Sequence, residues 1–248
     1  MVIHGGYWRA QYDLALGRPL AVDLNRHGWS TLNLEYRRVG NGGGAPETFD
    51  DIAAGIDLLA TLVPGYDGPV VALGHSAGGH LAVWAAARGR FGWPERVRLT
   101  HVISQAGVLD LRAAHRDGLS NDAVTDLLGS TVAEARFDPS QQLPLDVPVT
   151  CLHAADDDAV PISQSLDYVA ASQEAVARAT AGVGGETPEG VRGGQVREAR
   201  ADGKAVAATH VEVAGGHFDL IHPGTDAWAA VLASLPSASK PTDAPARS

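Results

Sequence analysis

The stretch that decides the fold is residues 69–80, PVVALGHSAGGH. Its first residues are apolar and include two valines, which favours a short buried strand. Gly74, Ser76 and Gly78 follow at the spacing G-x-S-x-G, and an Ala-rich helical segment comes next. Between a strand and a helix, this spacing predicts a tight, strained turn that projects the serine hydroxyl from the carboxyl edge of a sheet. The alternative is a glycine-rich turn with an incidental serine, because the bare motif often occurs by chance.

Outside this stretch, short β-branched runs alternate with longer runs of helical periodicity. Strands are expected at 2–4, 29–36, 69–75, 98–107, 147–155 and 205–215, and helices at 12–28, 47–63, 77–90, about 122–129, 161–179 and 226–235. This alternation, with continuous apolar strands, predicts the α/β class: a mostly parallel sheet with helices on both faces.

Length and composition narrow the class of protein. The chain has 248 residues, enough for a sizeable core, and we expect one domain over residues 1–236. Its net charge of −10 disfavours binding to nucleic acid or to an anionic membrane. No apolar run reaches the roughly 20 residues of a membrane span, and the first residues lack a signal-peptide pattern. The single cysteine, Cys151, is expected to be a buried hydrophobe in a cytoplasmic protein.

Two segments depart from the alternating pattern. Residues from about 181 to 204 are rich in glycine and charge and poor in large apolar side chains. We expect them to form a flexible surface insertion. Residues 237–248 are a Pro/Ser/Ala segment that we expect to be a disordered tail.

A serine nucleophile needs a base, and a histidine base needs a carboxylate that orients it. His217 follows a strand-like run and two glycines, so a loop there can reach the serine; His222 is the nearby alternative. Asp156, Asp157 and Asp158 follow another strand, although such an acidic run is also typical of a solvated turn. The chain order serine, aspartate, histidine matches a hydrolase built on this kind of turn.

Four motifs in this order resemble the α/β-hydrolase superfamily, specifically the HGG-type esterase group that includes the kynurenine formamidase-like enzymes. They are His4–Trp8 (HGGYW), Gly74–His80 (GHSAGGH), His153–Pro161 (HAADDDAVP) and Gly216–Phe218 (GHF). The resemblance covers Ile3 to about Leu235. The third motif is similar to the family pattern H-G-x-x-D-x-x-V-P, which places the triad acid on Asp157. Ala154 stands where the family usually has glycine.

The resemblance implies a catalytic triad of Ser76, Asp157 and His217. It also implies an oxyanion hole, because glycines let backbone N–H groups come close to a substrate. The residues expected to form this hole are Gly5, Gly6, Tyr7 and Ala77.

The same resemblance implies the surroundings of the site. Tyr7, Trp8 and His75 are the expected pocket residues, with core packing as the alternative for Trp8. His4 is expected to anchor the glycine loop by a hydrogen bond. The segment at about 109–143 falls where this fold usually inserts a cap that shapes the pocket.

Three functions are compatible with these residues. The first is a serine hydrolase that cleaves a small carboxylic ester through an acyl-enzyme, without a cofactor or metal. The second is an arylformamidase, which hydrolyses an amide of the N-formylkynurenine type by the same chemistry. The third, of another class, is a non-catalytic protein of this fold that only binds a small ligand. The presence of a candidate for each triad position favours an enzyme.

The start of the chain is short for this fold. Only Met1, Val2 and Ile3 precede the HGG motif, and the two strands that usually come earlier are absent. The strand at about 31–35 would then be an unpaired apolar edge, which invites aggregation. We expect either that Met1 is an internal start or that a homodimer protects this edge.

Overall fold

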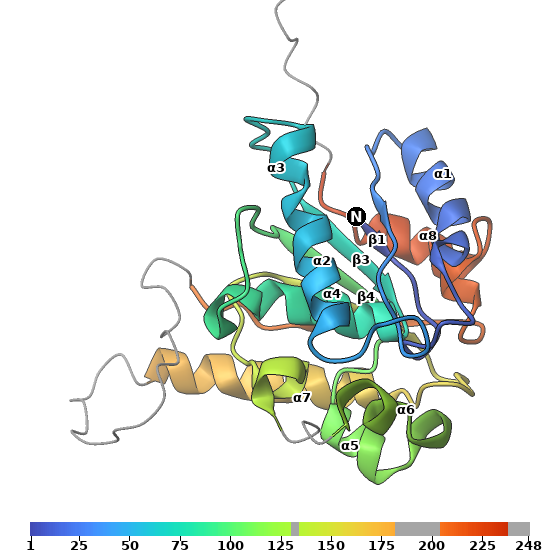
Figure 1. Ribbon diagram of the computed structural model, residues 1–248, viewed down its shortest axis with the longest axis vertical. Coiled ribbons are helices and arrows are strands. Elements are labelled where there is room, and N and C mark those ends of the chain that lie inside the picture. The colour runs from blue at the N-terminus through green and yellow to red at the C-terminus, as the bar shows by residue number, and fades with distance from the viewer. Residues whose placement is uncertain (130–133, 182–203, 238–248) are drawn as a thin grey trace, which may run out of the picture.

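The computed structural model describes residues 1–129, 134–181 and 204–237 (Figure 1). Nearly all of the expected insertion at 181–204 and of the expected tail at 237–248 lies outside these residues.

The described residues form one six-stranded sheet in which every pair of neighbouring strands is parallel. The strands are β1 (Val2–Ile3), β2 (Asn33–Leu34), β3 (Val71–His75), β4 (His101–Gln105), β5 (Val149–Ala154) and β6 (Thr209–Val213). Their order in the sheet is β2-β1-β3-β4-β5-β6. This confirms the α/β class and the mostly parallel sheet expected from the sequence.

The β2 end of the sheet is built from very short strands. Val2 of β1 pairs with Asn33 of β2 on one side and with Leu73 of β3 on the other. Among the described strands, β2 pairs with β1 alone and is therefore the edge of the sheet. It is two residues long, so the ladder at this edge is shorter than the sequence pattern predicts.

Helices connect the strands. They are α1 (Arg18–Arg26), α2 (Glu47–Asp57), α3 (Leu59–Leu62), α4 (Ala77–Ala87), α5 (Leu111–Arg116), α6 (Leu119–Leu128), α7 (Ser163–Ala181) and α8 (Asp226–Ala233). Short 3-10 turns are η1 (Leu14–Gly17), η2 (Arg88–Phe91), η4 (Ala135–Phe137), η5 (Pro139–Gln141) and η7 (Asp219–Ile221). None of the described helices is both long and apolar enough to cross a membrane.

Alternate strand residues contribute to two separate cores, one on each face of the sheet. Ala72 of β3 belongs to the core that α2, α4 and α7 cover, whereas Val71 and Leu73 belong to the core that α1 and α8 cover. This alternation follows from the two-residue repeat of a strand. Figure 1 shows α1 and α8 close together, away from α2 and α4. The expected helices on both faces are confirmed.

Two expected helices differ in detail. The pattern at 12–28 divides into η1, which Asp13 caps through the N–H of Ala15 at 2.7 Å, and α1. Pro19 lies in the first turn of α1, where a missing N–H costs nothing. The irregular stretch after β4 contains α5 as well as α6. Asp110 caps α5 by accepting the N–H of Ala113 at 2.8 Å, a signal that the sequence analysis missed.

Candidate active site

Ser76 occupies the turn between β3 and α4. Its backbone has φ 56° and ψ −122°, a conformation that costs an L-residue of order 1–3 kcal/mol. The turn is so tight that a Cβ added at Gly74 would lie 2.0 Å from the carbonyl oxygen of Gly78. A Cβ at Gly78 would lie 2.1 Å from the carbonyl oxygen of Ile3 in β1. The glycines of G-x-S-x-G are therefore required by close backbone contacts on both sides of the serine.

Asp157 is held in the turn that follows β5, here called the acid turn (residues 154–161). One carboxylate oxygen, Oδ1, accepts the backbone N–H groups of Ala159 at 2.9 Å and Val160 at 2.8 Å. The other oxygen, Oδ2, is thereby directed away from the turn. The side chain is fully buried.

His217 meets this second oxygen. Its Nδ1 lies 2.7 Å from Asp157 Oδ2, and because a carboxylate only accepts, Nδ1 must donate. The Nε2 atom of neutral His217 then carries the lone pair that a general base needs. The structure thus brings together the aspartate and the histidine that the motifs singled out.

The loop that carries His217 leaves β6 and returns to β3, three positions away in the sheet. Two contacts hold it there. The carbonyl oxygen of His217 lies 2.9 Å from Nε2 of His75, the residue before Ser76. The carbonyl oxygen of Leu220 accepts a hydrogen bond of 2.5 Å from the side chain of Gln105, at the end of β4. These contacts bring His217 to the residue that precedes the serine.

Asp157 remains ionised despite its burial. Burial alone would raise its pKa, but hydrogen bonds from His153, His217 and the backbone of Val160 hold the pKa well below its usual range. The negative charge that orients His217 is therefore stable far below neutral pH.

His153 is a part of this site to which the sequence analysis gave no role. Its Nε2–H donates to the carbonyl oxygen of Val160 at 2.9 Å and lies 3.3 Å from Asp157 Oδ2. Its Nδ1 is 2.8 Å from the hydroxyl of Ser165 in α7. The signal was present, since His153 opens the same motif as Asp157, four residues earlier.

The alternatives to Asp157 and His217 lie elsewhere. Asp156 and Asp158 are both exposed, on either side of the buried Asp157 carboxylate. His222 is exposed and follows η7.

The HGG loop lies directly against the serine. A Cβ added at Gly5 would lie 2.9 Å from the Cβ of Ser76. Gly6, Tyr7 and Trp8 follow with φ of 110°, 47° and 57°, a run of three residues in the left-handed half of conformational space. Among the described residues, no backbone hydrogen bond occupies the N–H of Gly6, Tyr7 or Ala77. These are three of the four residues expected to form an oxyanion hole; the fourth, Gly5, lies against Ser76.

His4 fixes the orientation of one of these N–H groups. Its Nδ1 donates to the carbonyl oxygen of Gly5 at 2.8 Å. In a trans peptide the C=O and the following N–H point in opposite directions, so this bond directs the Gly6 N–H away from His4. Arg38 Nη1 lies 3.2 Å from the other ring nitrogen, Nε2, and also contacts Glu35. Nε2 also lies 3.0 Å from Glu35 Oε1, a carboxylate oxygen that only accepts, and burial lowers the pKa of His4 despite this contact.

Two of the three expected pocket residues are buried. Trp8 is 0% exposed and donates its indole N–H to His80 Nδ1 at 3.2 Å, which is the core-packing alternative. His75 is 4% exposed because the loop of His217 covers it. Tyr7 is partly exposed, and its hydroxyl donates to the carbonyl oxygen of Ala159, which joins the HGG loop to the acid turn.

A family model described as BD-FAE matches residues 1–171, more than half of the chain. The chain belongs to the BD-FAE family. A comparison with curated proteins finds no match.

Solved structures similar to this BD-FAE member share its fold. Esterase B from Lactobacillus rhamnosis is 21% identical with a TM-score of 0.69, over 94% of this chain and 72% of that one. The carboxylesterase Cest-2923 from Lactobacillus plantarum is 19% identical with a TM-score of 0.66, over 94% and 82%. A truncated carbohydrate esterase from gut microbiota is 18% identical with a TM-score of 0.60, over 88% and 77%. These likenesses establish the α/β-hydrolase fold.

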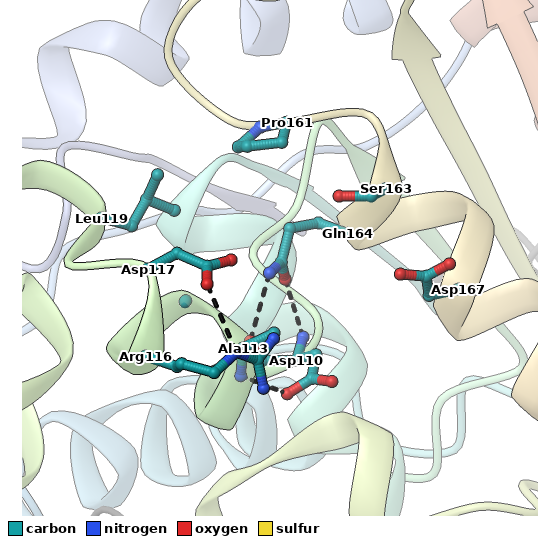
Figure 2. A pocket seen from close by; sticks show the side chains of 10 residues that line it. Asp110, Ala113, Arg116, Asp117, Leu119, Pro161, Ser163, Gln164 and Asp167 are labelled. Atoms are coloured by element: carbon teal, nitrogen blue, oxygen red, sulfur yellow. Dashed lines mark hydrogen bonds and ion pairs between the residues drawn. The ribbon is translucent and has the colours of Figure 1, made fainter.

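A small pocket of about 70 Å³, lined by both charged and apolar side chains, borders the acid turn in this BD-FAE member (Figure 2). Pro161, the last residue of the acid turn, lies on one side, and Asp110, Asp117 and Arg116 from the α5 region lie on the other. The side-chain amide of Gln164 spans the gap and bonds the backbone of Asp110, at 2.8 Å from its N–H and 3.2 Å from its C=O. The pocket thus lies between the acid turn and the expected cap segment.

Other chemistries find little support in the described residues. Cys151 is fully buried in β5, and burial raises the pKa of its thiol to about 12, so a thiolate nucleophile is disfavoured. In the part of the chain that the structure describes, no three histidine, cysteine or acidic side chains lie together as metal ligands would.

Proposed function

We propose that this BD-FAE member is a serine hydrolase that cleaves small carboxylic esters through Ser76, His217 and Asp157. The observation that carries the proposal is the 2.7 Å hydrogen bond between the buried Asp157 and His217, whose loop is fastened to the residue before Ser76. A serine hydroxyl is a weak nucleophile, and a histidine oriented by a carboxylate is the base that activates it.

The reaction follows from the roles of these groups. His217 Nε2 accepts the hydroxyl proton as Ser76 Oγ attacks the ester carbonyl, and Asp157 stabilises the imidazolium that forms. His217 then gives the proton to the leaving alcohol, which departs and leaves an acyl-enzyme. Water, deprotonated by His217, attacks this ester, and Ser76 is released with its proton restored.

The oxyanion that forms at each attack needs preorganised donors. The N–H groups of Gly6 or Tyr7, together with Ala77, are the donors that we assign to it. Each such donor contributes roughly 3–4 kcal/mol to the stability of the transition state. The bond from His4 to the Gly5 carbonyl supports Gly6 in this role, because it orients the peptide that carries the Gly6 N–H.

The substrate is proposed to be an ester whose alcohol part bears hydroxyl groups. The small pocket beside Pro161, at the end of the acid turn that carries Asp157, offers carboxylates and a guanidinium to such groups. Similar structures are described as a carboxylesterase and a carbohydrate esterase, which supports an ester substrate. An arylformamide is the second candidate, since the same triad chemistry cleaves it and the motifs resemble the kynurenine formamidase-like group.

A labelling experiment separates an enzyme from a binding protein. A fluorophosphonate should label the wild-type protein on Ser76 and should not label Ser76→Ala, while Ser30→Ala, at an exposed position, keeps the label. Ser76→Ala should lose roughly 10⁴- to 10⁶-fold in kcat. Assays with p-nitrophenyl acetate and N-formylkynurenine side by side then distinguish the two substrate classes. Retained turnover in purified Ser76→Ala would contradict the proposed nucleophile.

A further inference from the structure

His75 is a buried histidine beside the proposed triad that the mechanism above does not use. It is the last residue of β3, directly before Ser76, and its side chain lies under the loop of His217. The centroids of the His75 and His217 rings are 4.4 Å apart, with the planes inclined by 50°. Phe218 packs on the same ring, with centroids 6.0 Å apart.

The hydrogen bonds of His75 determine its tautomer. Its Nε2 faces the carbonyl oxygen of His217 at 2.9 Å, and a carbonyl only accepts, so the proton is on Nε2. The other nitrogen, Nδ1, is buried and has no hydrogen-bond partner in the described structure. A second proton on Nδ1 would be an unpaired buried charge beside the ring of His217. Burial accordingly lowers the pKa of His75 to about 3, and the side chain is neutral near pH 7.

The contact with His75 is made by the backbone of His217, whereas the contact with Asp157 is made by its ring. Asp157 therefore orients the imidazole, and His75 fixes the position of the loop that carries it. Asp219 closes this loop from within by accepting the N–H of Gly216 at 2.7 Å, while His75 and Gln105 fasten it to the sheet.

We propose that His75 is a positioning residue for His217: it donates Nε2–H to the His217 carbonyl and holds the proposed general base over Ser76. This inference rests on the proposed function, since His217 is a base only if Ser76 is a nucleophile. A displacement of about 1 Å in a catalytic group costs as much as 10²-fold in rate, so one buried hydrogen bond at this place has a measurable effect.

Two substitutions at His75 distinguish the effect of its hydrogen bond on activity from the effect of its ring volume. His75→Gln keeps an N–H donor at about the place of Nε2, whereas His75→Phe keeps a ring and has no donor. We expect His75→Phe to lose roughly 10- to 100-fold in kcat with KM changed less than about 3-fold. His75→Gln should recover most of this loss. His101, at the amino end of β4 and so at the opposite edge of the sheet, is the matched control. His101→Gln and His101→Phe should leave kcat unchanged.

A second measurement does not depend on activity. The proton on His217 Nδ1, bonded to Asp157 at 2.7 Å, should give a low-field NMR resonance protected from exchange. We expect this resonance to broaden or disappear in His75→Phe and to persist in His75→Gln. The proposal is overturned if His75→Phe keeps both the resonance and wild-type kcat, or if both variants lose kcat equally while remaining folded. If the wild-type protein shows no hydrolysis and no fluorophosphonate label, the proposed function fails, and the resonance alone tests the contact.

Discussion

The acid turn and the start of α6 are two irregular segments that are held in opposite ways. The acid turn directly follows β5, whereas the start of α6 comes after the neighbouring strand β4 and α5. In the acid turn, Asp157 accepts the N–H groups of the second and third residues after it, so the turn is closed by its own sequence. At the start of α6, Ser120, Asn121 and Asp122 have φ between 53° and 56°, and the side chain that holds them is Arg9, more than a hundred residues away.

The difference concerns where the stabilising contacts come from. Arg9 donates to the carbonyl oxygens of Ser120 at 2.8 Å and Asn121 at 3.1 Å, and to the carboxylate of Asp126 at 2.9 Å. A run of left-handed residues other than glycine costs roughly 1–2 kcal/mol for each residue. The acid turn has a local reason for its shape, whereas the start of α6 depends on the HGG loop, from which Arg9 extends.

The largest expected effect is the loss of activity on changing Asp157 in the acid turn. In Asp157→Asn, the amide oxygen still accepts the N–H groups of Ala159 and Val160, so the turn keeps its shape. The amide nitrogen then faces His217 Nδ1, which must accept, and the proton moves to Nε2. His217 is left in the tautomer that cannot take the serine proton, and kcat should fall roughly 10⁴-fold. Steady-state kinetics with p-nitrophenyl acetate measure this loss.

The neighbouring aspartates are the controls for this prediction. Asp156→Asn and Asp158→Asn change exposed side chains, and their kcat should stay within a few-fold of the wild-type value. A greater loss in either of them than in Asp157→Asn would assign the acid to another residue.

Contacts between residues close in the chain can be predicted from the sequence, whereas contacts between distant residues cannot. The orientation of the Asp157 carboxylate follows from residues close in the chain, because the N–H groups of Ala159 and Val160 in the same motif hold it. His75, in contrast, meets a carbonyl 142 residues away, and Arg9 meets Ser120 111 residues away, with no local signal for either contact. Trp8 could line a pocket or fill a core equally well by its chemistry, and only the packing against His80 decides between them.

The second-largest expected effect is a loss of folding stability as the pH falls. This loss should come from the buried histidines and not from the acid turn. His80 accepts from Trp8 at Nδ1 and donates from Nε2 to the Phe137 carbonyl, so it is held neutral. Burial lowers the pKa of His75 to about 3 and that of His80 to about 4. Since both values lie below the unfolded value near 6.5, the unfolded state binds more protons as the pH falls below 6.5, and stability is lost there.

Each of these two histidines should lower the free energy of unfolding by roughly 2 kcal/mol between pH 7 and pH 5. Asp157 adds nothing in this window, because its contribution is present above the unfolded pKa of about 3.9 and is lost only below it. Urea unfolding at the two pH values measures the loss. In His80→Gln the loss should shrink by roughly 2 kcal/mol, and in His222→Gln, at an exposed position, it should be unchanged. An unchanged loss in His80→Gln would refute the assignment to His80.

The third expected effect is a loss of stability at the start of α6. Arg9→Ala removes the donors that hold Ser120 and Asn121, and unfolding free energy should fall by roughly 1–2 kcal/mol. Hydrogen exchange should become faster for the amides of 118–128 and stay unchanged for Ala159 and Val160. Arg98→Ala removes a surface pair with Asp146 at 2.7 Å and serves as the control, with little change in either segment. Equal loosening of both segments in Arg9→Ala would show that they are not independently held.

The smallest effect has the opposite sign. Ser120 has φ 53° and ψ 50°, a conformation that glycine adopts without the steric cost borne by a residue with a Cβ. Ser120→Gly should therefore raise the free energy of unfolding by up to about 1 kcal/mol. Two effects reduce this gain: glycine has more conformational entropy in the unfolded chain, and the variant loses the weak 3.3 Å bond from Arg9 to the Ser120 hydroxyl. The same change at Ser165, which lies within α7 and whose hydroxyl contacts His153 of β5, should destabilise the protein. If Ser120→Gly also destabilises, the left-handed turn at the start of α6 is not the strained element that separates this region from the acid turn.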